Sequence, residues 1–233
     1  MKYVINILGA VILSINISGA QTGFGTKDGM IFMKDETGNQ LYAKTNYRIE
    51  GSPFYPNEYC SANIKVANGK WFEDVKIKLY LIDNLVYCLS DNSKELVVDM
   101  PIEKINFLNC MEGITGTGNS FQSGFSAIDK QTDKTFYKVL DSGNAKLLQY
   151  LNVTYSDEKP FNTAGITRVF KTAEILYANL PGNKMVKLNR NKESVISALA
   201  DKKNLVEAFI DSKGLKCKKE EDITMVFNYY NSL

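Results

Sequence analysis

Residues 75–89 read Val75-Lys76-Ile77-Lys78-Leu79-Tyr80-Leu81, then Ile82-Asp83-Asn84, then Leu85-Val86-Tyr87-Cys88-Leu89. Apolar and polar side chains alternate through the first segment, and a period of two is typical of a β-strand with one buried face. Asp83-Asn84 can close a two-residue turn, which predicts a hairpin with Leu81 opposite Val86 and Leu79 opposite Cys88. In that hairpin Cys88 points into the core, and Tyr80 pairs with Tyr87 on the other face.

The same pattern continues on both sides of this hairpin, from about residue 29 to residue 188. Turn residues predict three further hairpins: Asn68-Gly69 between 62–67 and 70–72, residues 141–144 between 136–140 and 146–155, and residues 181–183 between 174–180 and 185–188. Asn-Gly is a strong hairpin signal because both residues tolerate a positive φ. The Gly-rich stretch 113–124 is predicted to be a loop. These segments together predict an antiparallel sheet.

After Leu188 the period of the apolar residues lengthens toward 3.6, which predicts helices. Three apolar stripes follow: Val195, Ile196 and Leu199; Leu205, Val206, Phe209 and Ile210; and Ile223, Val226, Phe227 and Tyr230. Asn191 is a candidate N-cap of the first helix, and Gly214 is a candidate C′ residue of the second. Residues 220–222 are all acidic and suit the first turn of the third helix. Such short helices are unstable alone, so they must dock on one another or on the sheet.

The predicted fold class is therefore α+β: an antiparallel β meander, barrel-like or sandwich, followed by about three short C-terminal α-helices. We divide the chain into a signal peptide (1–20), an antiparallel β domain (21–190) and a C-terminal helical segment (191–233) packed on the same domain. One cooperative unit is expected, because the helices have too few apolar residues to form a separate core.

The first 20 residues have the features of a secretory signal peptide. Lys2 precedes an apolar run from Val4 to Leu13, and the small residues Ser18-Gly19-Ala20 follow. Polar residues interrupt the run, which is shorter than the roughly 20 apolar residues that a membrane-spanning helix needs. We predict cleavage after Ala20, a secreted or periplasmic protein, and no transmembrane segment in the mature chain.

Composition excludes several functions. The chain has no histidine, so it contains neither a Ser-His-Asp triad nor a histidine metal site. Its formal net charge is only +2, without the clustered basic residues of a nucleic-acid-binding protein. The four cysteines, Cys60, Cys88, Cys110 and Cys217, form no C-x-x-C pair, and both a disulfide and buried free thiols remain open. We expect no catalytic residue, no metal ligand and no cofactor.

An aromatic cluster is the one hint of a ligand surface. It comprises Phe54, Tyr55, Tyr59, Trp71, Phe72, Tyr80 and Tyr87. Outward rings on a sheet can stack on a sugar or line an apolar cavity, but cross-strand aromatic pairs also stabilise sheets without any ligand. The structural role is the favoured interpretation, and the ligand-binding residues are unknown at this stage.

Three segments together resemble an uncharacterised family of secreted or periplasmic proteins of Bacteroidota. They are Gly51-Ser52-Pro53-Phe54-Tyr55, the strand segment 75–83, and the C-terminal segment 220–233 with its Tyr229-Tyr230-Asn231 sequence. The resemblance implies an envelope location and carries over no catalytic residue.

Three functional hypotheses follow. The first is a non-enzymatic envelope module that binds a partner protein, and the second is a carrier of a lipid-like or glycan ligand on or in a curved sheet. The third and weakest is a hydrolase that uses carboxylates without histidine. A large apolar cavity would favour the carrier, and two facing carboxylates with raised pKa values would favour the hydrolase.

Overall fold

A computed structural model describes residues 25–27, 30–34, 40–42, 47–90, 92–108, 119–159 and 165–233. The chain divides into two units, residues 1–46 and residues 47–233. In the first unit, strands β1 (Gly25–Lys27), β2 (Met30–Lys34) and β3 (Gln40–Tyr42) form a small antiparallel sheet in that order. The predicted signal peptide and Cys110 lie outside the described residues.

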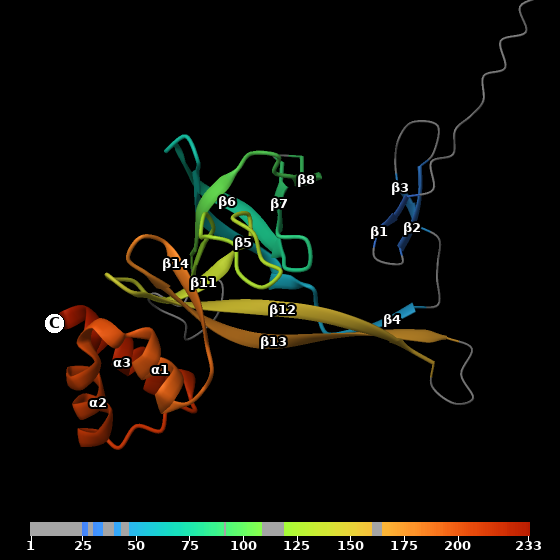
Figure 1. The fold of residues 1–233 in the computed structure, drawn as a ribbon. Helices are drawn as coiled ribbons and strands as arrows, with labels where there is room; N and C mark the ends of the chain where they lie inside the picture. The colour runs from blue at the N-terminus through green and yellow to red at the C-terminus, as the bar shows by residue number, and fades with distance from the viewer. Residues whose placement is uncertain are drawn as a thin grey trace, which may run out of the picture. The chain divides into compact units, whose positions relative to one another are not determined.

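The second unit is an eleven-stranded sheet with three helices at its C-terminal end (Figure 1). Its strands are β4 (Tyr47–Glu50), β5 (Phe54–Val66), β6 (Trp71–Tyr80), β7 (Leu85–Leu89), β8 (Glu95–Val97), β9 (Ile102–Phe107), β10 (Ser120–Gln122), β11 (Tyr137–Asp141), β12 (Lys146–Glu158), β13 (Ile166–Leu180) and β14 (Lys184–Leu188). The strand order is β14-β13-β12-β11-β10-β9-β5-β6-β7-β8, and β4 pairs with β13. Every pair is antiparallel except β4 with β13, which is parallel. The predicted α+β class is confirmed, with a sheet that is not closed into a barrel.

The hairpins at Asn68-Gly69, at residues 141–144 and at residues 181–183 are confirmed. Gly69 has a φ of +84°, as its turn requires. The sequence predicts two strands over residues 70–81, whereas the chain forms the single strand β6. Asp74 has a φ of +51° within it, and its N–H donates to the side chain of Asn63 on β5. The register with β5 also shifts at this point. The irregularity lets one strand continue through residues 73–74, where apolar and polar side chains stop alternating.

The predicted register of β6 and β7 is wrong by two residues. Leu79 lies opposite Val86 and Ile77 opposite Cys88, because the chain turns over four residues, 81–84, instead of two. A shift of two residues keeps every side chain on its predicted face. Cys88 accordingly packs against the buried cluster of Ile77 and Leu79, as predicted.

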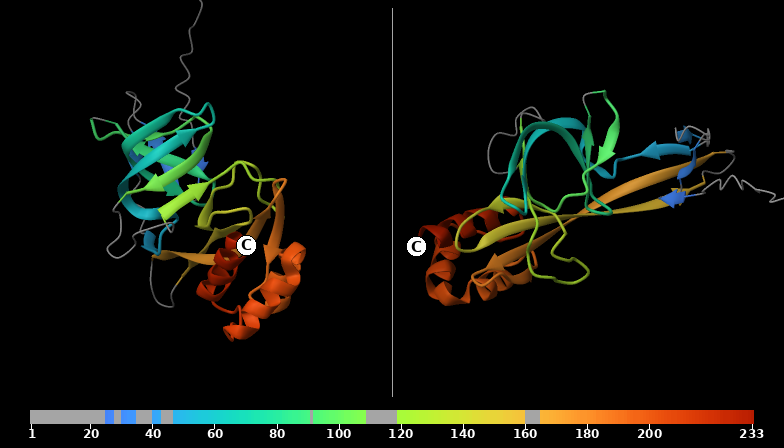
Figure 2. Two further views of the ribbon diagram at one scale, coloured as in Figure 1. Left: turned by 90° about the vertical axis from the view of Figure 1, so that its left-hand side faces the viewer. Right: turned by 90° about the horizontal axis from the view of Figure 1, so that it is seen from above.

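Strands β12 and β13 form a long two-stranded ribbon that extends beyond the rest of the second unit (Figure 2). They pair residue by residue from Lys146 with Asn179 to Glu158 with Thr167. The part near the helices is buried, whereas residues 154–158 of β12 are exposed. Near its outer end, Arg168 makes a bidentate ion pair with Asp157, and β4 lies along β13. The ribbon thus joins the core to an exposed outer part.

The helices are α1 (Lys192–Ala198), α2 (Lys203–Ser212) and α3 (Glu220–Ser232), with the 3₁₀ turn η2 (Ala200–Lys202) before α2. The Asn191 side chain caps α1 by accepting from the N–H of Ser194 at 2.8 Å. Gly214 ends α2 with a φ of +64°, and the N–H of Leu215 donates to the carbonyl of Ile210. Both predicted caps are confirmed. Leu205 was predicted to lie on the buried apolar stripe of α2, but its side chain is about half exposed.

Two large buried clusters hold this unit together. One cluster joins all three helices to β11–β14, through residues such as Leu176, Val195 and Phe227. The other lies among β5, β6, β7 and β9, through residues such as Ile77 and Ile105. A third, smaller cluster contains Tyr137 and Tyr177. The helices contribute one side of the first cluster and the sheet the other, so that cluster depends on both, whereas the second lies within the sheet.

The Tyr137 hydroxyl is buried without a hydrogen-bond partner among the described residues. Its ring packs against Phe125, Tyr150 and Tyr177, and burial raises its pKa to about 12. An unsatisfied buried hydroxyl costs about 1–3 kcal/mol. We therefore expect Tyr137→Phe to raise the free energy of unfolding by about 1 kcal/mol in urea titrations.

Tyr177→Phe is the matched control, because the Tyr177 hydroxyl donates to Asp129 at 2.9 Å. That variant should lose stability where Tyr137→Phe gains it. A loss in both variants would show that an internal water satisfies the Tyr137 hydroxyl.

Candidate functional site

The structure separates the predicted aromatic cluster into three groups. Phe54, Tyr59, Tyr80 and Tyr87 gather on one part of the sheet. Tyr55 packs inward against Phe107 and Phe121. Trp71 and Phe72 lie at the start of β6, where Trp71 is 43% exposed and Lys70 lies over the Phe72 ring. The seven residues therefore form no single surface.

The first of these groups surrounds a lysine of the chain itself. The Lys78 ammonium lies 4.3 Å from the ring centroid of Phe54, 4.5 Å from that of Tyr59 and 5.8 Å from that of Tyr87. Its Nζ is also 2.8 Å from Oε2 of Glu95 on the edge strand β8. Three rings and a carboxylate are the chemistry of a cation site. We call Lys78, these three rings and Glu95 the Lys78 cage. The three rings are thus in contact with a cation of the protein itself.

The carboxylate of the Lys78 cage has a perturbed pKa. Burial of Glu95 opposes its ionisation, but hydrogen bonds from Lys78 and Tyr59 and the charge of Lys78 outweigh that effect and lower the pKa. Tyr59 donates its hydroxyl to the same carboxylate, and burial together with this bond raises the pKa of Tyr59. The ionised Glu95 carboxylate thus connects the short strand β8 to Tyr59 on β5 and to Lys78 on β6.

Replacing Glu95 by Gln should reveal this contribution in the pH dependence of stability. Because the pKa of Glu95 is lower in the folded protein than in the unfolded chain, its contribution is present above the ordinary carboxyl pKa and disappears as the pH falls through the folded-state value. Glu95→Gln should be less stable than wild type at about pH 7 and should approach it at about pH 3. Urea unfolding at a series of pH values measures this difference.

Glu58→Gln is the control, because Glu58 is an exposed residue of the neighbouring strand β5. It should show no such pH-dependent difference from wild type. A difference for Glu95→Gln that stays constant with pH would mean that its charge plays no part.

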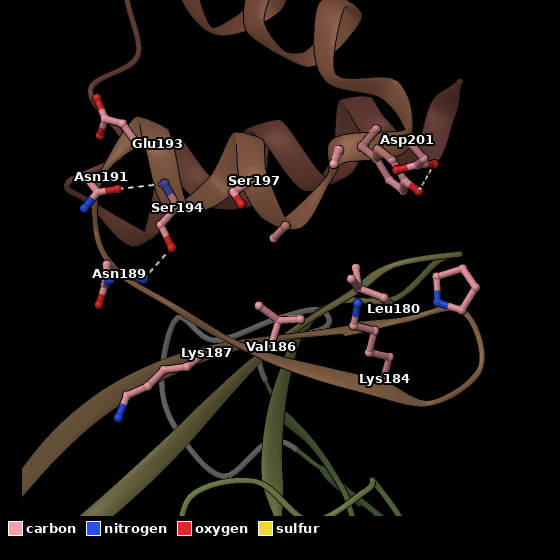
Figure 3. A pocket seen from close by; sticks show the side chains of 14 residues that line it. Leu180, Lys184, Val186, Lys187, Asn189, Asn191, Glu193, Ser194, Ser197 and Asp201 are labelled. Carbon is pink, nitrogen blue, oxygen red and sulfur yellow. Dashed lines mark hydrogen bonds between the residues drawn. The ribbon is translucent and has the colours of Figure 1, made fainter.

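A groove of about 850 Å³ lies between the β13–β14 hairpin and α1 (Figure 3). One wall consists of hairpin residues from Leu180 to Asn189, and the other of α1 and η2 from Asn191 to Asp201, with Tyr230 of α3 also lining it. The hairpin folds because Pro181-Gly182-Asn183 supplies the turn, with positive φ at Gly182 and Asn183. The Asn191 cap then starts α1 directly after β14, so that helix and strand lie close together.

The hairpin wall of the groove carries apolar side chains, and its helical wall is polar. Leu180 and Val186 pack against the large buried cluster beneath. Ser194 and Ser197 direct their hydroxyls from α1 toward the hairpin (Figure 3). The Ser194 hydroxyl accepts from the N–H of Asn189 at 2.9 Å. The lining is therefore mixed, unlike the large apolar cavity that a lipid carrier needs.

Tyr230 and Asp201 form one end of the groove. The Tyr230 hydroxyl donates to Oδ2 of Asp201 at 2.8 Å, and burial followed by this bond raises the pKa of Tyr230 to about 12. Lys202 covers the Tyr230 ring, with its Nζ 4.7 Å from the ring centroid. The ring is 3% exposed, so it offers no face on which a sugar could stack.

Charges are distributed unevenly along the groove. Lys187 lines it, but its side chain points away and its ammonium pairs with Asp129 at 2.9 Å. Lys184 points into the groove (Figure 3). Glu193 and Asp201 are exposed carboxylates at opposite ends of the helical wall. Because the Glu193 carboxylate points away from the hairpin (Figure 3), the charged groups that an occupant of the groove meets include Lys184 and Asp201.

Glu220 is the carboxylate whose pKa burial raises, with the charge of Glu174 as the next cause. Its carboxylate accepts a hydrogen bond from the amide of Gln149, which is 3% exposed. Neither Glu220 nor Glu174 lines the groove. The raised pKa therefore reflects packing of α3 on the sheet, away from the groove.

Cys60 is disulfide-bonded, and Cys88 and Cys217 carry free thiols. The part of the chain that the structure describes contains no group of three or more acidic or cysteine side chains arranged to hold a metal ion. No helix among the described residues is long and apolar enough to cross a membrane. Sequence reasoning missed the groove, although its two walls were predicted as separate elements. Comparison of the chain with protein families, with curated proteins and with solved structures finds no match.

Proposed function

We propose that this protein is an exported, non-enzymatic binding module that holds a polypeptide segment of a partner in the groove between the β13–β14 hairpin and α1. The observation that carries the proposal is the groove itself. It is open to solvent, has a polar helical wall and apolar side chains on its hairpin wall, and has a volume of about 850 Å³. Grooves that combine apolar side chains with polar groups recur among sites that bind peptide segments.

Two further observations support this function over the alternatives. Phe54, Tyr59 and Tyr87 of the aromatic cluster are in contact with Lys78, and Tyr55 packs inward, which leaves Trp71 as an isolated exposed ring. The disulfide at Cys60 and the signal-like N-terminus both suit a protein of an oxidising envelope compartment. A partner protein in the envelope is therefore the ligand that this surface suits best.

Selection of a displayed random-peptide library on the protein tests the proposal. Ser197→Trp is the blocking variant, because Ser197 is an exposed residue of α1 that points into the groove. An indole there should fill the groove without disturbing the core. We expect selected peptides to lose at least about ten-fold in affinity for this variant, equivalent to about 1.4 kcal/mol.

Ser212→Trp is the matched control, since Ser212 is an exposed helical serine outside the groove. Peptides should bind it as they bind wild type. A library that yields no peptide, or only peptides that bind Ser197→Trp equally well, would refute the proposed function.

A further inference from the structure

We propose that the face of the sheet formed by β6, β5, β9 and β10 binds an acidic oligosaccharide, with Trp71 against a sugar ring and Lys104 and Lys146 on its anionic groups. None of these three residues lines the groove, so the site is independent of the function proposed for the groove. Three features lead to the inference: a row of side chains across the strands, two lysines without a carboxylate, and an exposed indole.

One row of side chains crosses four neighbouring strands. From β6 to β10 its members, each opposite the next, are Trp71, Lys65, Lys104 and Gln122. Opposed residues of paired strands share a face of the sheet. The chain neighbours Ile64, Ile105 and Phe121 are buried in the cluster on the other face. Because adjacent strands lie about 4.8 Å apart, the row is about 14 Å long and faces away from that cluster.

Two lysines at the β10 end of the row lie close enough to repel each other. The Lys146 ammonium donates to Oε1 of Gln122 at 3.2 Å and lies 5.5 Å from the ring centroid of Phe125. Burial and then the charge of Lys104 lower the pKa of Lys146, and the charge of Glu103 opposes this shift. An anion bound between the two lysines would relieve the repulsion.

The one acidic residue next to Lys104 in β9 is already paired. Glu103 lies where the register of β5 and β9 shifts, and its Oε2 is 3.0 Å from Nζ of Lys65. Among the residues that the structure describes, no ion pair involves Lys104 or Lys146. These two ammonium groups therefore remain available to an external carboxylate or sulfate, with which an ammonium forms strong hydrogen bonds.

Trp71 supplies the apolar part of the site at the other end of the row. Its side chain is 43% exposed, and it is the only tryptophan of the chain. An indole presents a large flat apolar face and one polar N–H at its edge. That face suits the apolar side of a sugar ring, whose hydroxyl groups lie around its rim.

An acidic oligosaccharide suits this face better than an acidic peptide does. At the row, β5 pairs with both β6 and β9, and β9 pairs with both β5 and β10. Their main-chain groups are used within the sheet, so a peptide cannot add to them as a further strand. Recognition depends on side chains alone. A flat ring and two ammonium groups match a ligand that combines sugar rings with anions.

The fluorescence of Trp71 reports directly on this site, because no other tryptophan contributes to it. The whole protein is titrated with a hyaluronan fragment, whose anions are carboxylates, and with a heparin fragment, which also carries sulfates. The matched control is the same hyaluronan fragment with its carboxylates converted to methyl esters. A poly-glutamate peptide of equal charge tests the acidic-peptide alternative.

We expect at least one acidic fragment to shift the emission and to bind at least about five-fold more tightly than the ester or poly-glutamate. Salt should weaken this binding, because it screens exposed charges. Preference for heparin would identify sulfate as the anion, and equal binding of the two fragments would identify carboxylate. No response to either fragment, or equal binding of the ester or of poly-glutamate, would overturn the inference.

Calorimetric titration of variants then locates the binding. Lys104→Gln should weaken it about three-fold and Trp71→Ala about five-fold, whereas Trp71→Phe should lose less because it keeps a ring. Lys171→Gln, at an exposed lysine of β13, should bind as wild type does. Full affinity in both Lys104→Gln and Trp71→Ala would refute the site.

Ser197→Trp separates this site from the groove. That variant should keep full affinity for the acidic fragment while it loses the selected peptides. A parallel loss of the acidic fragment would place its binding in the groove and overturn the inference, without contradicting the proposed function.

Discussion

Replacing Asn231 by Ala should lower the free energy of unfolding by about 3 kcal/mol, although Asn231 is only two residues from the C-terminus. Its side chain brackets Ala145 on the β11–β12 hairpin. The amide oxygen accepts from the N–H of Ala145 at 3.0 Å, and the amide nitrogen donates to the Ala145 carbonyl at 2.8 Å. The same nitrogen donates to Asp141 at 2.7 Å. Because Ala145 is fully buried, truncation leaves two main-chain groups without partners or water.

Gly143 provides an independent test of the position of the Asn231 side chain. A Cβ atom at Gly143 would lie 2.3 Å from Cγ of Asn231, so the Asn231 side chain occupies the space that an alanine would need. Gly143→Ala should therefore destabilise wild type strongly but cost little in the Asn231→Ala background. A double-mutant cycle by urea unfolding measures this coupling.

Asn228→Ala, at an exposed position of the same helix, is the control for the loss of an asparagine from α3. It should leave stability nearly unchanged. Additive effects of Gly143→Ala and Asn231→Ala would contradict the contact between these two residues.

Phe227→Ala should lower the free energy of unfolding by about 3–5 kcal/mol, as truncation of a buried Phe does. Phe227 of α3 is fully buried in the cluster that joins the helices to β11–β14. The cavity would open on the side where sheet and helices meet. For a domain stable by about 5–15 kcal/mol, this is a large fraction of the total.

The manner of unfolding tests whether helices and sheet form one cooperative unit. Helical ellipticity and the near-ultraviolet signal of the tyrosines in the sheet should be lost together in one transition, at a lower urea concentration than in wild type. Met225→Ala, at a position that is 45% exposed on the same helix, should shift the transition only slightly. Loss of the helical signal before the tyrosine signal would show that the helices dock on a sheet that is stable without them.

Side-chain periodicity predicts which face of each element is buried better than it predicts register. Strands β6 and β7 show this, because Cys88 faces the core as expected although its partner is Ile77 instead of Leu79. The longer turn is stabilised from outside the hairpin: Asn84 has a φ of +54°, and its side chain accepts from the N–H of Phe136. That contact joins residues 52 apart in the chain, which local pattern reasoning cannot detect.

The pattern of apolar residues also did not predict most of the outer part of the β12–β13 ribbon. Beyond Val153 and before Ile175 many side chains are exposed, so no alternation of apolar residues marks these strand segments. The groove was missed for a different reason. Its walls, residues 180–189 and 191–201, were predicted separately, but the space between them depends on how closely α1 approaches the hairpin. That distance is set by packing of Val195 and Leu199 in the shared cluster.

Each residue of the Tyr229-Tyr230-Asn231 sequence makes a specific contact in the structure. Tyr229 stacks on Phe209 with ring centroids 4.1 Å apart, Tyr230 bonds to Asp201 at the groove, and Asn231 brackets Ala145. Three consecutive residues thus connect α3 to α2, to the groove and to the sheet. The sequence motif could be recognised in advance, but these three contacts come from elements distant in the chain.

The position of β13 has a consequence for the order of events during synthesis. This strand lies between β12 and β14 and also pairs with β4, so it contacts segments from both ends of the second unit. Until a ribosome has made residues 166–180, β4 has no neighbour and β12 lacks one of its two. Pairing between such distant segments is slow and must wait for nearly the whole chain. The pairings of β4, β12 and β14 with β13 are therefore among the last steps in the assembly of this sheet.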